Sequence, residues 1–149
     1  MVATTASKAE VFNLRTPYLT QGRTTDLRAR TDLMTVMVKV YAEGGENGMH
    51  CHTTEDHTFI VVEGQATFRV DNDDNVKVVN RWEGIMLPKG TYYRFESTGD
   101  QNLVLIRAGA TPIGQKNERL GVDGKPLPSD SKENGRVERI EAPGRGFGE

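Results

Sequence analysis

Apolar and polar side chains alternate with a period of two along the middle of this chain. Between residues 33 and 41, apolar side chains at positions 34, 36, 38 and 40 alternate with the side chains at the odd positions. Successive side chains of a β-strand point to opposite faces, so this period predicts a strand over 33–41. Shorter segments rich in strand-forming residues follow at 57–63, 65–70, 76–79, 85–87, 92–96 and 103–107.

Short strands at regular spacing, each bounded by turn residues, predict an all-β fold. No stretch carries a good amphipathic helical pattern, so the segments are typical of a closed or nearly closed antiparallel barrel. The 149 residues fit one domain. We expect the barrel over 31–110 and an N-terminal arm over 1–30. The region 111–149 is rich in Gly, Pro and charged residues, which predicts an extended polar tail.

The segment 57–63 is apolar on both faces, although a strand of a small barrel needs only one apolar face. Phe59 and Val61 share a face with His57, whereas Ile60 and Val62 lie on the other. A strand of this kind is normally covered on both sides. The outer cover is either a second copy of the chain or the N-terminal segment folded back over its own barrel. We expect the second copy, and therefore a homodimer.

Composition excludes several kinds of partner. The net charge of −2 comes without a basic stripe, which predicts no nucleic-acid partner. No apolar run approaches the length that spans a bilayer, and the first residues lack the apolar centre of a signal peptide, so we expect no membrane partner. Cys51 is the one cysteine, which suits a reducing compartment. We expect a cytoplasmic protein with a small-molecule substrate.

The 3 histidines of the chain, His50, His52 and His57, form one short cluster. Residues two apart point to nearly opposite sides of a helix, but on a strand they share a face and lie about 6.6 Å apart. His57 follows at an odd offset, so the intervening residues must turn the chain before its imidazole can join the others. The spacing therefore predicts strand, turn and strand, with three imidazoles converging where the strands meet.

Three converging neutral imidazoles suit a mononuclear metal site. Such a set binds Fe, Zn, Ni, Mn, Co or Cu and leaves coordination positions open for water and substrate. The alternative is that the three histidines are solvated side chains on the rim of the barrel. Because all three lie in one short segment, this is the weaker interpretation. We expect His50, His52 and His57 to hold one divalent transition metal per chain. Glu55 or Asp56 would orient a histidine through its second nitrogen.

Two sequence motifs resemble those of the cupin superfamily. The first reads Gly44-x5-His50-x-His52-x4-His57-x6-Gly64, close to the cupin pattern of two histidines and a glutamate between two glycines. The segment 84–93, with Pro88-Lys89-Gly90 at its centre, is similar to the second motif. The resemblance covers about residues 31–108. It implies a single cupin-type antiparallel β-barrel, also called a double-stranded β-helix or jelly roll, with a metal in the barrel mouth.

Two positions depart from the family pattern. His57 stands where cupins usually have the glutamate, and Tyr93 stands where they usually have the last histidine. If the second motif aligns in this way, Tyr93 points into the same cavity as the histidines. It would act on the substrate as a hydrogen-bond or proton donor, ligate the metal as a phenolate, or only line the barrel. We identify Tyr93 as the candidate catalytic residue.

The resemblance implies several functions, because one fold hosts many chemistries. The leading hypothesis is a metalloenzyme, and specifically an oxidoreductase like the three-histidine cupin dioxygenases, acting on an oxygen-rich or aromatic small molecule. A second hypothesis is an isomerase, lyase or polyketide-cyclase-type enzyme that uses the metal as a Lewis acid. A third is a cupin that binds a small molecule without turnover. Replacement of the usual glutamate by His57 makes the site more positive and favours anionic substrates.

Overall fold

The computed structural model describes residues 8–129 and 137–149, and that part of the chain contains strands but no helix. The all-β prediction is therefore confirmed. No helix long and apolar enough to cross a membrane occurs in these two ranges. The strands are β1 (Thr16–Gln21), β2 (Arg23–Arg30), β3 (Met34–Tyr41), β4 (His50–His52), β5 (Asp56–Glu63), β6 (Gln65–Val70), β7 (Val76–Asn80), β8 (Gly84–Leu87), β9 (Tyr93–Ser97), β10 (Leu103–Ala110), β11 (Arg119–Gly121) and β12 (Ile140–Phe147).

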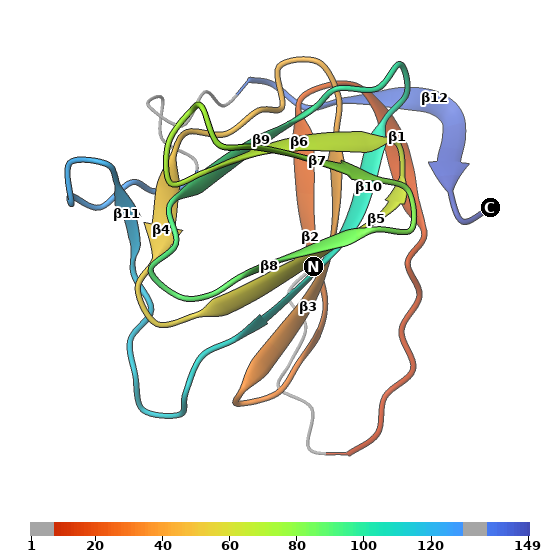
Figure 1. Cartoon of the computed structure of the whole chain (residues 1–149). Coiled ribbons are helices and arrows are strands. Elements are labelled where there is room, and N and C mark those ends of the chain that lie inside the picture. Colours follow the sequence, from red (N-terminus) through yellow and green to blue (C-terminus); the bar gives the residue numbers. More distant parts are fainter. Residues whose placement is uncertain (1–7, 130–136) are drawn as a thin grey trace.

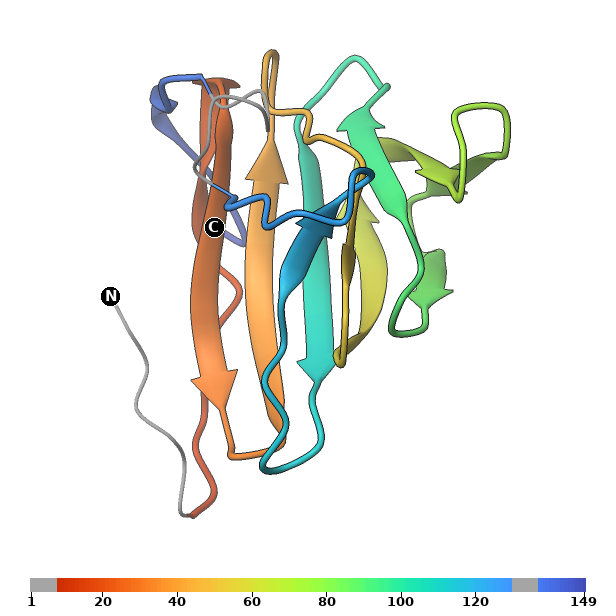
Figure 2. The same ribbon diagram turned by 90° about the vertical axis from the view of Figure 1, so that its left-hand side faces the viewer.

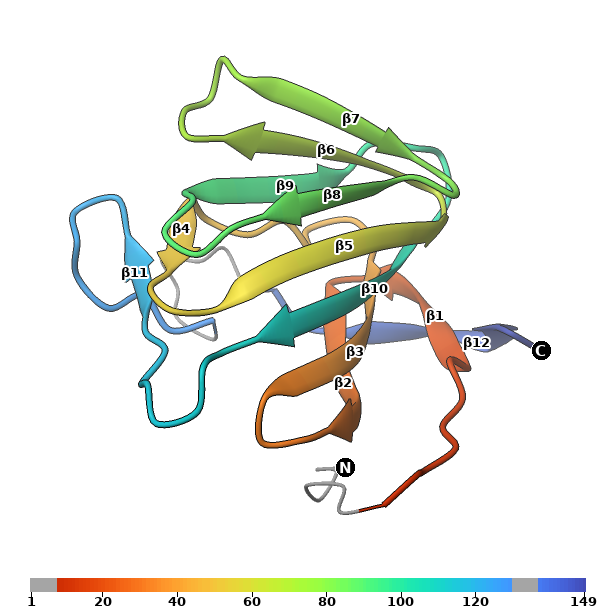
Figure 3. The same cartoon turned by 60° about the horizontal axis from the view of Figure 1, so that its bottom comes forward.

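Two five-stranded antiparallel sheets face each other and form the barrel (Figure 1). One sheet has the order β2-β3-β10-β5-β8, and the other has the order β11-β4-β9-β6-β7. Figure 2 shows β2, β3 and β10 side by side, and Figure 3 shows the layers from below. A smaller sheet pairs β1 with β12. Every pairing is antiparallel, as predicted for a barrel of this type.

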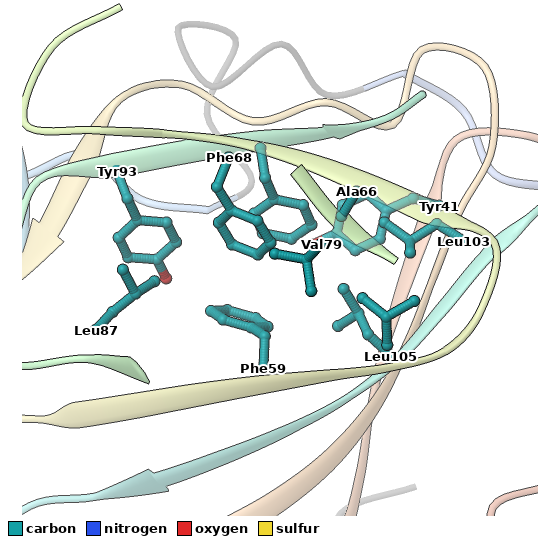
Figure 4. Close-up of a cluster of buried hydrophobic side chains, with 11 residues drawn as sticks. Tyr41, Phe59, Ala66, Phe68, Val79, Leu87, Tyr93, Leu103 and Leu105 are labelled. Carbon is teal, nitrogen blue, oxygen red and sulfur yellow. The ribbon is translucent and has the colours of Figure 1, made fainter. Parts of the chain in front are cut away.

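The main core lies between the two sheets and is largely aromatic (Figure 4). The rings of Phe68 and Phe95 stack with their centroids 4.7 Å apart, and the ring of Phe59 lies 5.2 Å from that of Phe95. All three side chains are almost fully buried. Aromatic rings remove more apolar surface from water than other side chains, so a few of them stabilise a narrow barrel. The predicted inward direction of Phe59 is confirmed.

A second core covers the outer face of the first sheet. Leu19 of β1 packs there with Val38, Val40, Val62 and Val104. The hydroxyl of Tyr18 also donates a hydrogen bond to Glu63 over 2.7 Å. The N-terminal segment thus covers part of the outer face of β5, which was one of the two covers considered from the sequence. Ile60 on the same face keeps 41% of its surface exposed.

The alternation along β3 decides which of its side chains face the inside of the barrel. Its valines face outward under β1, and the alternate residues Met37, Lys39 and Tyr41 face the inside of the barrel. The apolar face of this strand is covered by the chain's own terminal sheet, so the interior receives the more polar set. This places a lysine on the inner wall.

Both ends of the chain add strands to the barrel region. β2, within the range predicted as an N-terminal arm, pairs with β3 along its length. β11, within the range predicted as a tail, pairs with β4, and β12 pairs with β1. The sequence pattern of these segments is too polar for period-two alternation to identify them. The domain boundaries at 30 and 110 stay a prediction.

Replacement of Gly64 tests the turn between β5 and β6. Gly64 has a φ of 81°, and a Cβ there would lie 2.6 Å from the backbone oxygen of Asn102. We expect Gly64→Ala to lower the free energy of unfolding by about 3 kcal/mol, from backbone strain and the steric clash together. Gly114→Ala is the matched control, because Gly114 has a φ of 85° with open space around it. Urea unfolding measures both, and equal losses would contradict the proposed clash.

Candidate functional site

The histidine cluster lies at one mouth of the barrel, where β4 of one sheet meets β5 of the other. His50 and His52 lie on β4, the chain bends at Thr53 and Thr54, and His57 follows on β5. The predicted strand, turn and strand are thus confirmed. His57 pairs with Gly109 of β10, where a Cβ would lie 2.8 Å from the Glu55 carboxylate and 3.3 Å from the His57 ring. The glycine leaves room for both side chains.

The three imidazoles converge as the spacing predicts. The ring centroids of His52 and His57 lie 4.2 Å apart, and those of His50 and His52 lie 5.2 Å apart. His50 and His57 are almost fully buried. The Nδ1 atom of His50 lies 2.6 Å from the carbonyl oxygen of Gly48, so Nδ1 carries the proton and Nε2 keeps its lone pair.

A carboxylate joins this cluster. One ligand atom from each of His52, Glu55 and His57 lies within 4.8 Å of the others, a separation that one metal ion can bridge. His50, expected as the third ligand, is not part of this group, and the three-histidine ligand set stays a prediction. Two imidazoles and a carboxylate also fit a divalent transition metal by their donor chemistry. The geometry therefore fits a metal with Glu55 as the third ligand, and His50 stays the third ligand that the motif predicts.

Burial keeps the histidines neutral. It lowers the pKa of His50 to about 3, and it also lowers the pKa values of His52 and His57. Neutral imidazole is the form that binds a metal. Burial acts in the opposite direction on Glu55, but the contacts of its carboxylate with His57 and Arg107 outweigh burial and lower its pKa. At neutral pH the cluster thus has neutral imidazoles and one ionised carboxylate.

Arg107 is the cation closest to this cluster. Its Nη2 atom lies 2.5 Å from Oε1 of Glu55 and 2.5 Å from Nε2 of His57. The side chain is buried on β10, with Nη1 3.1 Å from the sulfur of Met37. Sequence alone does not indicate which face of the barrel Arg107 occupies. The guanidinium orients Glu55 and adds a fixed positive charge to the site.

Tyr93 points into the same cavity, as the alignment of the second motif predicts. It pairs with His50 across β4 and β9, and the two rings lie 4.5 Å apart. Its hydroxyl lies 3.3 Å from Nδ1 of His57, and the residue is 3% exposed. Burial raises the pKa of Tyr93 to about 12, so the hydroxyl stays protonated at neutral pH. This favours a hydrogen-bond donor over a phenolate ligand.

A cavity of about 490 Å³ opens in front of these side chains. His50, His52 and Tyr93 form one part of its lining. The remaining polar lining consists mainly of cationic and hydroxyl-bearing side chains: Arg23, Thr24, Thr25, Asp26, Lys39, Tyr41, Asn47, Arg107, Arg119, Ser129 and Arg139. A volume of this size suits a small organic molecule.

Two neighbours of the cluster face away from it, as alternation predicts. Cys51 is buried between the two β4 histidines and pairs with Leu120 of β11. Asp56 accepts a hydrogen bond from the backbone of Lys89 over 2.8 Å and does not contact the histidines. Neither residue is a candidate ligand.

The comparisons with known proteins agree with the fold. Residues 37–108 match the family model described as a cupin domain. Together with the barrel, this match places the chain in the cupin superfamily as a single-barrel member. Among curated proteins, none matches the chain significantly.

Solved structures with this fold include three instructive neighbours. An uncharacterised conserved protein with a double-stranded β-helix domain from Klebsiella pneumoniae has 16% identity and a TM-score of 0.61, over 75% of this chain and 97% of that one. The Cnp3 cupin domain of Schizosaccharomyces pombe has 17% identity and a TM-score of 0.56, over 60% and 64%. KdgF from Halomonas sp. has 14% identity and a TM-score of 0.56, over 60% and 79%. At these identities the likeness concerns the fold alone.

Sequence reasoning did not identify Lys39 or Arg119 as residues of the site. For Lys39 a signal exists, because it shares a strand face with Tyr41 and lies opposite the valines of β3. For Arg119 no signal exists, because its strand is short and lies in a polar region. The sequence predicts that Glu55 orients a histidine, whereas the structure places its carboxylate among the candidate ligands.

The neutral histidines predict a particular dependence on pH. The unfolded chain has ordinary histidines with a pKa of 6.5, whereas the folded pKa of His50 is about 3. The unfolded state then binds more protons between these values, so stability is lost as pH falls below 6.5. Each such histidine contributes a slope of up to about 1.4 kcal/mol per pH unit. His50→Gln should reduce the slope of unfolding free energy against pH by about that amount in chelator-treated protein.

Proton NMR of the same chelator-treated protein provides a direct check. The 3 histidines give three imidazole signals, and we expect those of His50 and His52 not to titrate between pH 8 and pH 5 and that of His57 to titrate below its ordinary pKa of 6.5. A signal from the folded protein with a midpoint near 6.5 would contradict the burial of that imidazole. The assignment needs only the three single histidine variants.

Proposed function

We propose that this chain is a metal-dependent cupin enzyme that acts on an oxygen-rich or aromatic small molecule, in the manner of a dioxygenase. The observation that carries the proposal is the convergence of buried, neutral imidazoles with a carboxylate in front of a cavity. Burial of a polar group without a hydrogen-bond partner costs free energy, so a buried polar cluster of this kind is typical of a functional site. Membership of the cupin superfamily supports a metal-binding site of this kind.

His52 and His57 are the two ligands common to both candidate sets. The third is His50, as the motif implies, or Glu55, as the distances favour. A bound transition metal supplies Lewis acidity toward a substrate oxygen and, for a redox-active ion, a route to dioxygen. Of these residues, His50 and His52 line the cavity, which supports substrate binding near the metal.

Tyr93 is the proposed catalytic residue. Its protonated hydroxyl lies 3.3 Å from Nδ1 of His57 and has one proton to donate, either to that nitrogen or to a substrate oxygen in the cavity. A protonated phenol with a high pKa can stabilise negative charge that develops on a substrate oxygen. The buried aromatic side chains around it exclude water and keep the hydroxyl in place. Arg107 and Glu55 keep their contacts with His57 and so fix the ring that Tyr93 touches.

Metal analysis tests the core of the proposal. We expect purified protein to bind about one equivalent of a transition metal. His52→Ala should lower the metal affinity by more than about 100-fold, because loss of a residue that only orients a ligand typically costs about 10- to 100-fold. His50→Ala and Glu55→Ala, measured side by side, identify the third ligand as the variant with the larger loss. Lys116→Ala is the control, because the Lys116 side chain is 86% exposed. Wild-type protein without stoichiometric metal would disprove the proposal.

Oxygen consumption separates the two enzymatic hypotheses. With iron bound, a dioxygenase should consume dioxygen in the presence of catechols or enolisable keto acids, and the zinc form should not, because zinc has no redox chemistry. Tyr93→Phe should lower kcat by about 10²- to 10³-fold, the effect of removing one oxyanion donor. Turnover by the zinc form would instead identify an isomerase, lyase or cyclase. Binding without turnover in either form would leave the non-catalytic cupin.

We also propose a cytoplasmic homodimer that uses the outer face of β5 and β8. Ile60 is 41% exposed and Met86 is 63% exposed there, beyond the part covered by β1. Thr58 pairs with Met86, so the two apolar side chains lie on adjacent strands. Sedimentation analysis of the full chain measures the mass directly, and a monomer at micromolar concentration would exclude this assembly.

A further inference from the structure

The cavity in front of the histidines is strongly cationic. Five of its lining side chains are basic, namely Arg23, Lys39, Arg107, Arg119 and Arg139. Asp26 is the one acidic side chain in that lining. The chain as a whole has a net charge of −2, so the excess of positive charge is local to this cavity. A concave site lined by charge of one sign attracts ligands of the opposite sign.

Several of these charges already have partners. Arg107 lies 2.5 Å from Glu55, and Arg139 lies 2.5 Å from Glu141. Arg23 donates to backbone carbonyl oxygens, including that of Ser129 at 2.7 Å, and so holds loops in place. These side chains have structural reasons to be where they are, and they do not by themselves indicate a ligand.

Lys39 is different. It lies on the inward face of β3, and its Nζ atom lies 5.5 Å from the centroid of the Tyr41 ring. Among the ion pairs of residues 8–129 and 137–149, none joins Lys39 to a carboxylate. Burial lowers the pKa of Lys39 well below its ordinary value, and Arg107, Arg23 and Arg119 lower it further by repulsion. A lysine surrounded by cations in a barrel interior costs stability, which is the pattern of a ligand-binding group.

Arg119 belongs to the same wall. It lies on β11 opposite His52 of β4, and its guanidinium also donates to the carbonyl oxygen of Leu127. Burial lowers the pKa of Arg119 to about 10, so the group stays cationic at neutral pH. Its pairing with His52 places it at the histidine end of the cavity, which it lines.

We propose that the ligand of this cavity is a small organic carboxylate, bound through its carboxylate group by Lys39 and Arg119, with its other polar atoms toward the histidines and Tyr93. That this carboxylate is the substrate rests on the proposed function. That the carboxylate binds here rests only on the residues of the cavity. A guanidinium offers a planar pair of donors that matches a carboxylate, and an ammonium adds a compact charge. An anion held there supplies the negative charge that Lys39 lacks among the described residues.

The test is calorimetric titration of the full-length protein with succinate, once with zinc bound and once after removal of metal by a chelator. We expect saturable binding of succinate, and binding of the neutral analogue succinamide at least 100-fold weaker. Lys39→Met and Arg119→Met should each weaken succinate binding at least 10-fold. Lys116→Met, which changes an exposed lysine, should leave it unchanged. Inorganic phosphate and methanesulfonate extend the series and show whether other oxyanions bind the same site.

A second measurement separates binding from folding. Because Lys39 is a half-buried basic side chain beside three arginines, Lys39→Met should leave the melting temperature unchanged or raise it while succinate binding weakens at least 10-fold. The proposal is overturned if Lys39→Met or Arg119→Met binds succinate as tightly as the wild type does. It is also overturned if the wild type binds succinamide as well as succinate, or if it binds none of succinate, phosphate and methanesulfonate saturably. Succinate binding by a protein that contains no stoichiometric metal as purified would instead disprove the proposed function and support the anion site. A purified protein that holds stoichiometric metal but binds none of these anions would disprove the anion site and support the proposed function.

Discussion

The position of β10, paired on one side with β3 and on the other with β5, is the constraint on which the site depends. In this register Arg107 lies opposite Met37 on β3 and Phe59 on β5, Leu105 lies opposite Lys39, and Gly109 lies opposite His57. A shift of one residue in either pairing would turn every inward side chain of that strand outward. The hydrogen-bonded ladder therefore decides which charges meet the histidines, and the covered outer face of the sheet fixes the ladder.

The features that follow from local periodicity could be predicted from the sequence. The strands that carry regular alternation or strong strand formers were found within a few residues of their ends, and so was the turn that brings His57 back to His50 and His52. The inward direction of Tyr93 also followed, because a motif of fixed length connects it to Pro88 and Gly90. Each of these depends on residues that are neighbours along the chain, where the period of a strand is a sufficient guide.

The features that depend on long-range pairing could not be predicted. β1, β2, β11 and β12 contain polar residues or lack a strong alternating pattern, and they form strands because partners far away in the chain offer hydrogen bonds. The carboxylate of Glu55 reaches His57 because the chain bends between β4 and β5 and Gly109 leaves space, two conditions that no single segment reveals. The inward direction of Lys39 depends on β1, which covers the valines on the other face of β3.

The pairing of β11 with β4 has a consequence for how the protein reaches its working form. His52 and Arg119 lie opposite each other although 67 positions separate them in the chain, and β12 closes onto β1 with Phe147 opposite Thr16. Contacts between such distant residues form slowly, because the chain must first lose the entropy of a long loop. Arg119 of β11 then joins the basic lining of the cavity only after the inner strands have paired. A newly made barrel would hold its histidines, Lys39 and Arg107 before Arg119 joins them, so competence to bind an anion through both Lys39 and Arg119 would arise late in folding.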